Sequence, residues 1–234
     1  MSAVTIGIIG AMDAEIEWLK TQLQDIQVHQ FAEKFTIYTG KIKQYNIVLS
    51  LSGIGKVNAA VATTLVIQHF SPDYIINTGS AGGIGQGVRV GDVVIGNEAA
   101  HHDVDASVFG YAYGQVPQLS ARFGAHEKLI NAAIQAANVF QAAKVHQGLI
   151  VSGDCFVHHQ EHIAQIKEHF ADAQAVEMEA AAIAQTCVLF NVPFVIIRAI
   201  SDSAEEKAEI SFEEFLKVAA QHSAQMVMNL MEQL

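Results

Sequence analysis

At residues 176–183 the sequence reads VEMEAAAI, and its two carboxylates stand where a short apolar run turns into an alanine-rich helical segment. Another apolar run, residues 194–200, ends in a serine and an aspartate. Open α/β sheets build their binding sites at the carboxyl ends of strands. We therefore expect the carboxylates of both stretches to meet at one edge of a sheet, together with Glu15.

Short apolar runs of strand type alternate with helix-like segments along the whole chain. This alternation predicts a sheet with helices on both faces, and the lack of an internal repeat or linker predicts a single domain over residues 1–234. The expected strands are residues 4–9, 35–40, 45–52, 74–77, 90–98, 144–152, 173–176 and 194–200. The expected helices are residues 12–25, 57–70, 128–140, 161–170 and 179–190, with a last helix that starts at Ser211 and has Glu214 in a capping-box position. Residues 203–210 are charged and are expected to form a loop.

The composition excludes several classes of protein. Hydrophobic residues make up 51% of the 234 residues and charged residues 16%, which provides a sizeable core and argues against disorder. A net charge of −11 with only three arginines argues against a nucleic-acid partner, because phosphate binding needs clustered cations. No apolar run reaches about 18 residues and no basic segment precedes an apolar one, so we expect neither a membrane span nor a signal peptide. The two cysteines lack a CxxC partner, which favours reduced thiols and a cytoplasmic location.

Glycine-rich sequences follow three of the first expected strands. They are GIIGAM at residues 7–12, SGIGK at residues 52–56 and TGSAGG at residues 78–83. None matches the dinucleotide-binding or the P-loop pattern. A single such turn is ordinary loop punctuation, but three of them at strand ends favour a binding crevice, because glycine lets the backbone approach a ligand closely.

Each candidate residue also has a purely structural interpretation. Glu15 lies in the first turn of an expected helix, where any acid complements the helix dipole. Asp202 is placed to cap a turn, and Met178 to fill the core. The aromatic residues between Phe109 and Pro117 fit either a solvated loop or an interface patch.

Histidines suggest a metal site in two places. Residues 101–105 combine two histidines with two aspartates, and His158 is followed by His159. Hydrolytic metal sites use such ligands, but eleven histidines make chance adjacency easy and the chain has no HExxH motif. We therefore expect no catalytic metal.

Eight motifs taken together carry a resemblance to a known family. In chain order they are GIIGAMDAE, SGIGKV, IINTGSAGG, VGDVV, HDVDASVFGY, GLIVSGDCF, AVEMEAAAIA and NVPFVIIRAISD. Each motif alone is weak, but the ordered set, which runs from about residue 4 to the C-terminus, closely resembles the bacterial 5′-methylthioadenosine/S-adenosylhomocysteine nucleosidases. The resemblance implies an α/β fold: a three-layer αβα sandwich around a mixed, twisted sheet, shared with the nucleoside phosphorylases.

The same resemblance implies a role for individual residues. Glu15 matches the base that activates the attacking water, and Asp202 matches the acid that protonates N7 of adenine. Ala106 and Phe109 match positions that cross a dimer interface into the neighbouring pocket, although Ala106 is smaller than the usual valine. The substrate-binding positions are Met12, Ile54 and Phe212 around the 5′-alkylthio group, Ser80 and Arg198 beside the water and ribose, Phe156 and Val157 at the purine, Met178 and Glu179 at the ribose, Ser201 beside the acid, and Glu177.

The implied activity is hydrolysis of the N-ribosidic bond of methylthioadenosine, S-adenosylhomocysteine and 5′-deoxyadenosine, in methionine salvage. The implied partners are the nucleoside and a second copy of the chain, with no metal or organic cofactor. One alternative is a purine nucleoside phosphorylase on the same fold, and another is a non-catalytic nucleoside-binding protein. A phosphorylase needs cations for phosphate, whereas a binding protein should have lost Glu15, Glu179 or Asp202.

Overall fold

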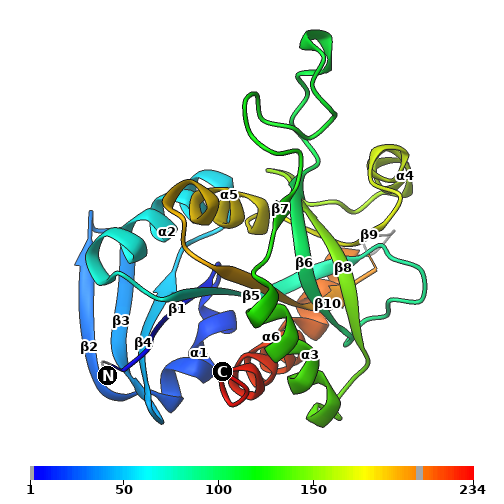
Figure 1. Cartoon of the computed structure of the whole chain (residues 1–234). Helices are drawn as coiled ribbons and strands as arrows, with labels where there is room; N and C mark the ends of the chain where they lie inside the picture. Colours follow the sequence, from blue (N-terminus) through cyan, green and yellow to red (C-terminus); the bar gives the residue numbers. More distant parts are fainter. Residues whose placement is uncertain (1–2, 204–207) are drawn as a thin grey trace.

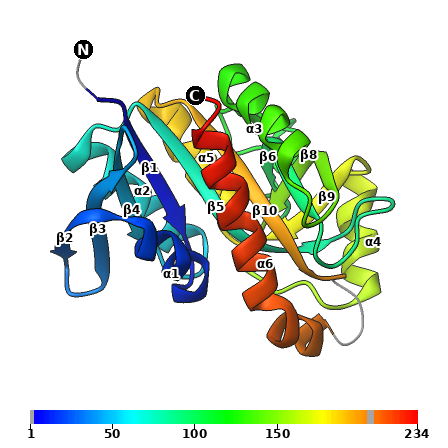
Figure 2. The ribbon, with the colours of Figure 1, turned by 90° about the horizontal axis from the view of Figure 1, so that it is seen from below.

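A mixed β-sheet carries helices on both of its faces, so that the molecule has three layers (Figures 1 and 2). The structure, a computed structural model, describes residues 3–203 and 208–234. Within these residues the sheet contains β1 (Thr5–Gly10), β2 (Gln24–Phe31), β3 (Phe35–Ile42), β4 (Tyr45–Leu51), β5 (Tyr74–Gly83), β6 (Val93–His101), β7 (Phe123–Gly124), β8 (Val145–Ser152), β9 (Ala173–Glu177) and β10 (Phe194–Asp202).

Helices α2 and α5 cover one face of the sheet, and α1, α3 and α6 cover the other (Figure 1). Helix α4 packs beside β8 and β9 through Ile166. In the part of the chain that the structure describes, no helix has the length and apolar character to cross a membrane. The helices are α1 (Asp13–Gln22), α2 (Lys56–Phe70), α3 (Glu127–Val139), α4 (Gln160–His169), α5 (Ala180–Phe190), α6 (Ala208–Met231) and the short 3₁₀ helix η1 (Ser107–Phe109).

The strand order brings the ends of four strands to one place. The order is β2-β3-β4-β1-β5-β9-β8-β6-β10, and β10 also pairs with β5, so the last five strands close into a ring. Strand β5 is parallel to β1 and to β10, which puts the carboxyl ends of all three at one edge. Strand β9 reaches the same edge, where Val176 pairs with Gly82.

The sequence of β10 shows why the sheet lies inside the molecule. All of its residues from Phe194 to Asp202 are buried, as expected for a strand that pairs on both edges and is covered on both faces. Each fully buried Ile or Leu stabilises the fold by about 1.5–3 kcal/mol. Arg198 is the one charged residue in the apolar run of residues 194–200. Its guanidinium is fully buried, and a buried charge has to be paired.

Near the first helix one expected element is too long and one strand was not predicted. The helix expected over residues 12–25 ends at Gln22, and residues Gln24–Phe31 form strand β2 instead. This strand pairs antiparallel with β3, with an irregularity between Gln24 and Gln27. Its side chains are mostly exposed, which hides the alternation that would have identified a strand.

The sequence TGSAGG was expected to be a turn, but it continues strand β5 as far as Gly83. Pairing with β10 on one edge and β9 at its end keeps this glycine-rich segment extended. The last helix begins at Ala208 rather than at Ser211. The side chains of the expected capping box, and residues 204–207 of the expected charged loop, lie outside what the structure describes.

Candidate active site

A pocket of about 440 Å³ opens at the carboxyl ends of β1, β5, β9 and β10. Carboxylates and small residues form its floor, and apolar side chains form its rim. Its lining residues are Ala11, Met12, Glu15, Ile54, Ser80, Ala81, Gly82, Phe156, Val176, Glu177, Met178, Glu179, Ser201, Asp202 and Phe212.

Glu15 is buried in the first turn of α1, directly after β1, and four donors orient its carboxylate. Oε2 accepts hydrogen bonds from the backbone N–H groups of Ala11, at 2.8 Å, and Met12, at 3.1 Å. Oε1 accepts from the N–H of Ser80, at 2.8 Å, and from its hydroxyl, at 2.9 Å. These bonds join the end of β1 to β5 and turn the carboxylate toward the pocket.

Arg198 lies behind the pocket, fully buried in β10, and its guanidinium connects the acidic residues. Nη2 donates to Asn77 Oδ1 at 2.9 Å, donates to Glu177 Oε2, and lies 3.5 Å from Glu179 Oε2. Burial opposes the charge, but Glu177, Glu179 and Glu15 outweigh it and raise the pKa of Arg198. One permanent cation therefore interacts with three glutamates, so the site has an excess of negative charge whenever all three are ionised.

Glu177 holds the start of α5. Its carboxylate accepts hydrogen bonds from the backbone N–H groups of Glu179 and Ala180 and from the Ser152 hydroxyl, besides its ion pair with Arg198. An acid at this position complements the positive end of the helix dipole. Although Glu177 lines the pocket, its oxygens are already occupied by the protein.

Glu179 is the residue at which β9 turns into α5, and one of its oxygens accepts the N–H of Gly55 at 2.9 Å. Gly55 belongs to the glycine-rich turn that follows β4. Burial, followed by the charge of Glu177, raises the pKa of Glu179 to about 8, against the opposing effect of Arg198. The raised pKa means that ionising Glu179 in this site costs free energy. A ligand that brings positive charge or a hydroxyl donor offsets that cost, so the site suits such a ligand.

Asp202 is buried at the last position of β10, beside Gly82 in the glycine-rich end of β5. Ser201 donates its hydroxyl to Asp202 Oδ2 at 2.9 Å. The rim above is apolar: Phe156 is 40% exposed, and its ring meets that of Phe212 edge to face at 5.8 Å between centroids. An aromatic ring that is exposed at the mouth of a pocket is available for stacking on a planar ligand.

Comparisons with known proteins identify the family. A sequence model described as the phosphorylase superfamily matches residues 5–232. The 5′-methylthioadenosine/S-adenosylhomocysteine nucleosidase of Staphylococcus aureus is 53% identical over 233 residues, which cover 98% of this chain and 100% of that protein. The chain belongs to this nucleosidase family.

Solved structures agree with this membership, and the expected αβα fold is confirmed. The Neisseria meningitidis nucleosidase in complex with methylthio-immucillin-A is 58% identical, with a TM-score of 0.97 and coverage of 98% of this chain and 99% of that one. The Colwellia psychrerythraea nucleosidase in complex with adenine is 42% identical, with a TM-score of 0.96 and coverage of 99% and 96%.

Most residues that the nucleosidase resemblance singled out do meet at the pocket. Arg198 lies beneath it, and Val157 is buried next to Phe156 with its side chain in the core around α4. Ala106 and Phe109 do not reach the pocket of their own chain, because they belong to the long segment between β6 and β7 that projects from the body (Figure 1). Those that line the pocket are Met12, Glu15, Ile54, Ser80, Phe156, Glu177, Met178, Glu179, Ser201, Asp202 and Phe212.

Several residues that support the site were not predicted. Asn77 and Ser152 bind Arg198 and Glu177, and neither stands out in an apolar strand sequence. Gly79 is needed for space, since a Cβ there would lie 2.1 Å from Arg198 Nη1 and 2.7 Å from Glu15 Oε1. The glycine-rich sequence TGSAGG did point to this position, but the expected reason was close approach of the backbone to a ligand, not the volume of neighbouring side chains.

Proposed function

We propose that this chain hydrolyses the N-ribosidic bond of 5′-methylthioadenosine and S-adenosylhomocysteine, releasing adenine and the 5-thioribose product. Its relatives with these names match it over nearly their whole length. The neighbouring structures hold methylthio-immucillin-A or adenine, and the aromatic rim of the pocket found here suits a planar base. The reaction is a step of methionine salvage.

The observation that carries the proposal is the charge of the pocket. Glu15, Glu179 and Asp202 line it together, and in the described part of the chain no lysine or arginine lines it. Cleavage of an N-ribosidic bond builds positive charge on the sugar in an oxocarbenium-like transition state. Buried carboxylates that are already oriented stabilise such charge as it develops.

In this mechanism the carboxyl groups of Asp202 and Glu15 have different tasks. Asp202, oriented by Ser201, gives a proton to N7 of adenine as the bond between C1′ and N9 breaks, so the base leaves neutral. A water held by Glu15 forms the new bond to C1′ and passes its proton to that carboxylate, with inversion at the carbon. Because four donors already occupy Glu15, the Ser80 hydroxyl has to rotate away to admit this water.

A phosphorylase on the same fold fits the site less well. Phosphate needs cationic donors, most often arginine. Arg198 is already held by Glu177 and Asn77, Arg122 pairs with Glu98 and Asp172, and Arg89 is exposed on the loop before β6. Inorganic phosphate would also meet the carboxylate of Glu15, so water is the better nucleophile here.

A non-catalytic nucleoside-binding protein is the other alternative. Such a protein has no use for a proton donor opposite a water-binding carboxylate. Glu15, Glu179 and Asp202 are all present and all face one pocket, which supports catalysis.

We include a homodimer in the proposal. Val108 and Phe109 on η1 are 84% and 79% exposed at the tip of the segment that projects beyond the α2 and α5 layer (Figure 1). The same layer carries exposed apolar side chains on both helices, among them Val57 on α2 and Leu189 on α5. Together these surfaces suit a two-fold interface in which each projecting segment rests on the other subunit and brings Phe109 toward its pocket.

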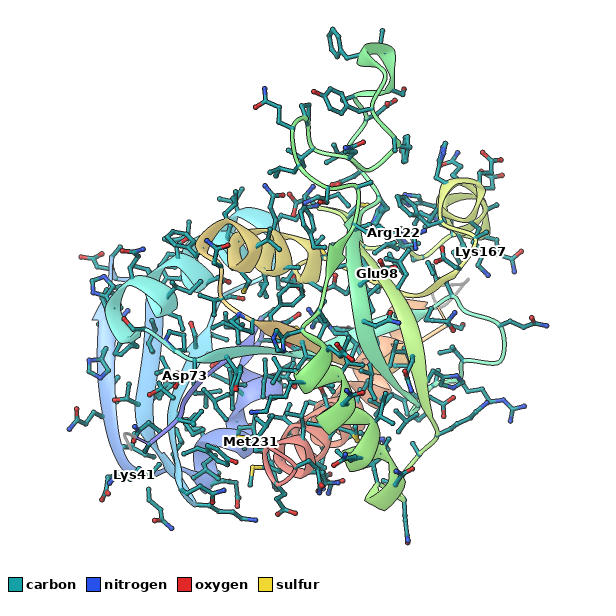
Figure 3. All side chains as sticks on the ribbon, in the orientation of Figure 1. Lys41, Asp73, Glu98, Arg122, Lys167 and Met231 are labelled. Carbon is teal, nitrogen blue, oxygen red and sulfur yellow. The ribbon has the colours of Figure 1, made fainter. Side chains whose placement is uncertain are left out.

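Two ion pairs connect the base of the projecting segment to the body of the molecule. Arg122, after the segment, pairs with Glu98 on β6 at 3.1 Å and with Asp172 at 2.7 Å (Figure 3). The proposal also places the protein in the cytoplasm, in agreement with its two free cysteines, and treats the whole chain as one domain, in agreement with its continuous sheet.

Adenine release from methylthioadenosine, S-adenosylhomocysteine and 5′-deoxyadenosine, each with purified protein, tests the proposed function. We expect release from the first two at rates typical of enzymes, about 1–10³ per second. No release from any of the three, with tight binding of an adenosine analogue, would favour the binding-protein alternative. The comparison of rates also settles the order of preference among the substrates.

A further inference from the structure

Three potential metal ligands meet outside the catalytic pocket. They are His102, directly after β6, Cys155 in the loop between β8 and α4, and His162 in the first turn of α4. One ligand atom from each residue lies within 4.8 Å of the other two. None of the three lines the pocket, and none has a task in the mechanism above.

His102 is the most unusual member of this group. Its side chain is only 3% exposed, and its Nε2 atom has no hydrogen-bond partner among the described residues. A buried polar atom without a partner costs about 1–3 kcal/mol, so natural proteins seldom leave one without a reason. The centroids of the His102 and His162 rings lie 5.7 Å apart with the rings at 78° to each other, so the two imidazoles are neighbours at this position.

The backbone around His102 is arranged to hold the ring in place. Its N–H donates to the carbonyl of Ser152 at 2.8 Å. The ring fills the space beside Gly153, where a Cβ would lie 2.4 Å from His102 Cε1. Asp103 adds negative charge nearby and is itself paired with Lys56. A rigid buried imidazole with two half-buried partners is the arrangement that metal sites require.

We propose that His102, Cys155 and His162 bind a Zn²⁺-class divalent cation. Two imidazoles and one thiolate, with water in the fourth position, make a donor set that zinc prefers. Tetrahedral bonds of about 2.0–2.1 Å to nitrogen and 2.3 Å to sulfur place ligand atoms about 3.3–3.7 Å apart. The present separations are all within 4.8 Å, so they have to close by at most about 1.5 Å, through rotation of the two half-buried side chains.

The bound cation acts on the rim of the active site. Cys155 directly precedes Phe156, the ring at the mouth of the pocket, and His162 belongs to the helix that follows. A cation that joins both to the end of β6 restrains the loop that carries Phe156. Anything that binds the folded chain and not the unfolded one also raises the midpoint of thermal unfolding.

Titration of the metal-free, full-length protein with Zn²⁺ and with Co²⁺ tests this proposal. We expect one ion per chain, a higher midpoint of thermal unfolding, and a thiolate-to-cobalt charge-transfer band in the near ultraviolet. Cys155→Ser should abolish that band and His162→Gln should weaken binding, each with at least about a 10–100-fold loss of affinity. Both positions are half-buried, so circular dichroism should show that the variants keep the fold.

Matched controls separate this site from adventitious binding by the other histidines. Cys187→Ser removes the other cysteine, and His159→Gln removes an exposed histidine three residues before His162. Both should bind the ion as the unaltered chain does. Equal affinity in all five proteins, or no binding and no cobalt–thiolate band in the unaltered protein, would overturn the proposal.

Discussion

Arg198 gives the site its charge balance, since within the described residues its guanidinium is the one cation that contacts Glu177 and Glu179. Its position in an apolar strand forces it to be paired, and the strand ends on either side supply the acids. Glu15, Glu177 and Glu179 all line the pocket, but Glu177 is fully used in holding the protein together. When the acids are ionised, the excess negative charge is suited to a transition state in which the sugar becomes cationic, and Glu179, with a pKa of about 8, adds its charge as the pH rises toward that value.

The proposed role of Asp202 as the general acid predicts a specific kinetic defect. Asp202→Asn keeps the shape of the side chain and its bond from Ser201 but has no proton to give to N7 of adenine. General acid catalysis typically contributes about 10²–10⁴-fold, so the rate of adenine release should fall by about that factor. Thermal unfolding should change little, and Asp13→Asn, an exposed aspartate beside the pocket, serves as the control. Near-normal turnover of Asp202→Asn would reduce this residue to a turn cap.

The raised pKa of Glu179 predicts that stability depends on pH. This pKa is about 8 in the folded chain and about 4.3 in the unfolded chain. Between these values the folded chain holds the additional proton, so the free energy of unfolding falls as the pH rises, by up to about 1.4 kcal/mol per pH unit. The stability that this proton contributes is complete at pH values below the pKa of the unfolded chain. It is lost as the pH rises through the pKa of the folded chain.

Glu179→Gln cannot titrate, so urea unfolding at a series of pH values should show this variant gaining on the unaltered chain as the pH rises toward about 8. Glu17→Gln, an exposed acid on α1, should keep the original slope. Identical slopes in all three proteins would show that Glu179 is ionised in the fold at neutral pH.

At the scale of elements, the sequence predicted the strands and helices whose own pattern of apolar residues identifies them. The alternation of apolar runs predicted β10 and α5. The positions of acids at the ends of apolar runs predicted Glu15, Glu179 and Asp202 as residues of one site. Long-range pairing could not be predicted in this way. The exposed β2 forms only because β3 is available beside it, and the glycine-rich end of β5 is extended only because β9 and β10 pair with it.

The same reasoning explains why the need for space at Gly79 was not predicted, and it indicates what replacement of this glycine should do. Gly79→Ala places a methyl group against the buried Arg198 and Glu15, both of which are held by other bonds. Overpacking typically costs about 1–3 kcal/mol, and the shift of Glu15 should lower adenine release by at least tenfold. Gly124→Ala is the matched control, because its Cβ would meet nothing within 4 Å. Equal activity of both variants would contradict the packing seen here.

At the scale of the whole molecule, the projecting segment should hold two copies together. Replacing both Val108 and Phe109 by serine removes the most exposed apolar side chains of η1. Sedimentation analysis should show a dimer for the unaltered chain and a shift toward monomer for the variant. Val28→Ser, at an exposed valine on β2, should leave the dimer intact. An unaltered chain that is fully active as a monomer would refute the interface.

The central claim is that water, not phosphate, attacks the sugar in a pocket whose described lining residues are acidic and apolar without a cation. The most direct measurement is adenine release from methylthioadenosine with and without saturating inorganic phosphate, with the free sugar followed by proton NMR and any sugar phosphate by phosphorus NMR. The account predicts equal rates in both conditions and a free 5-methylthioribose product. Release that requires phosphate, or that yields a ribose 1-phosphate, would contradict it.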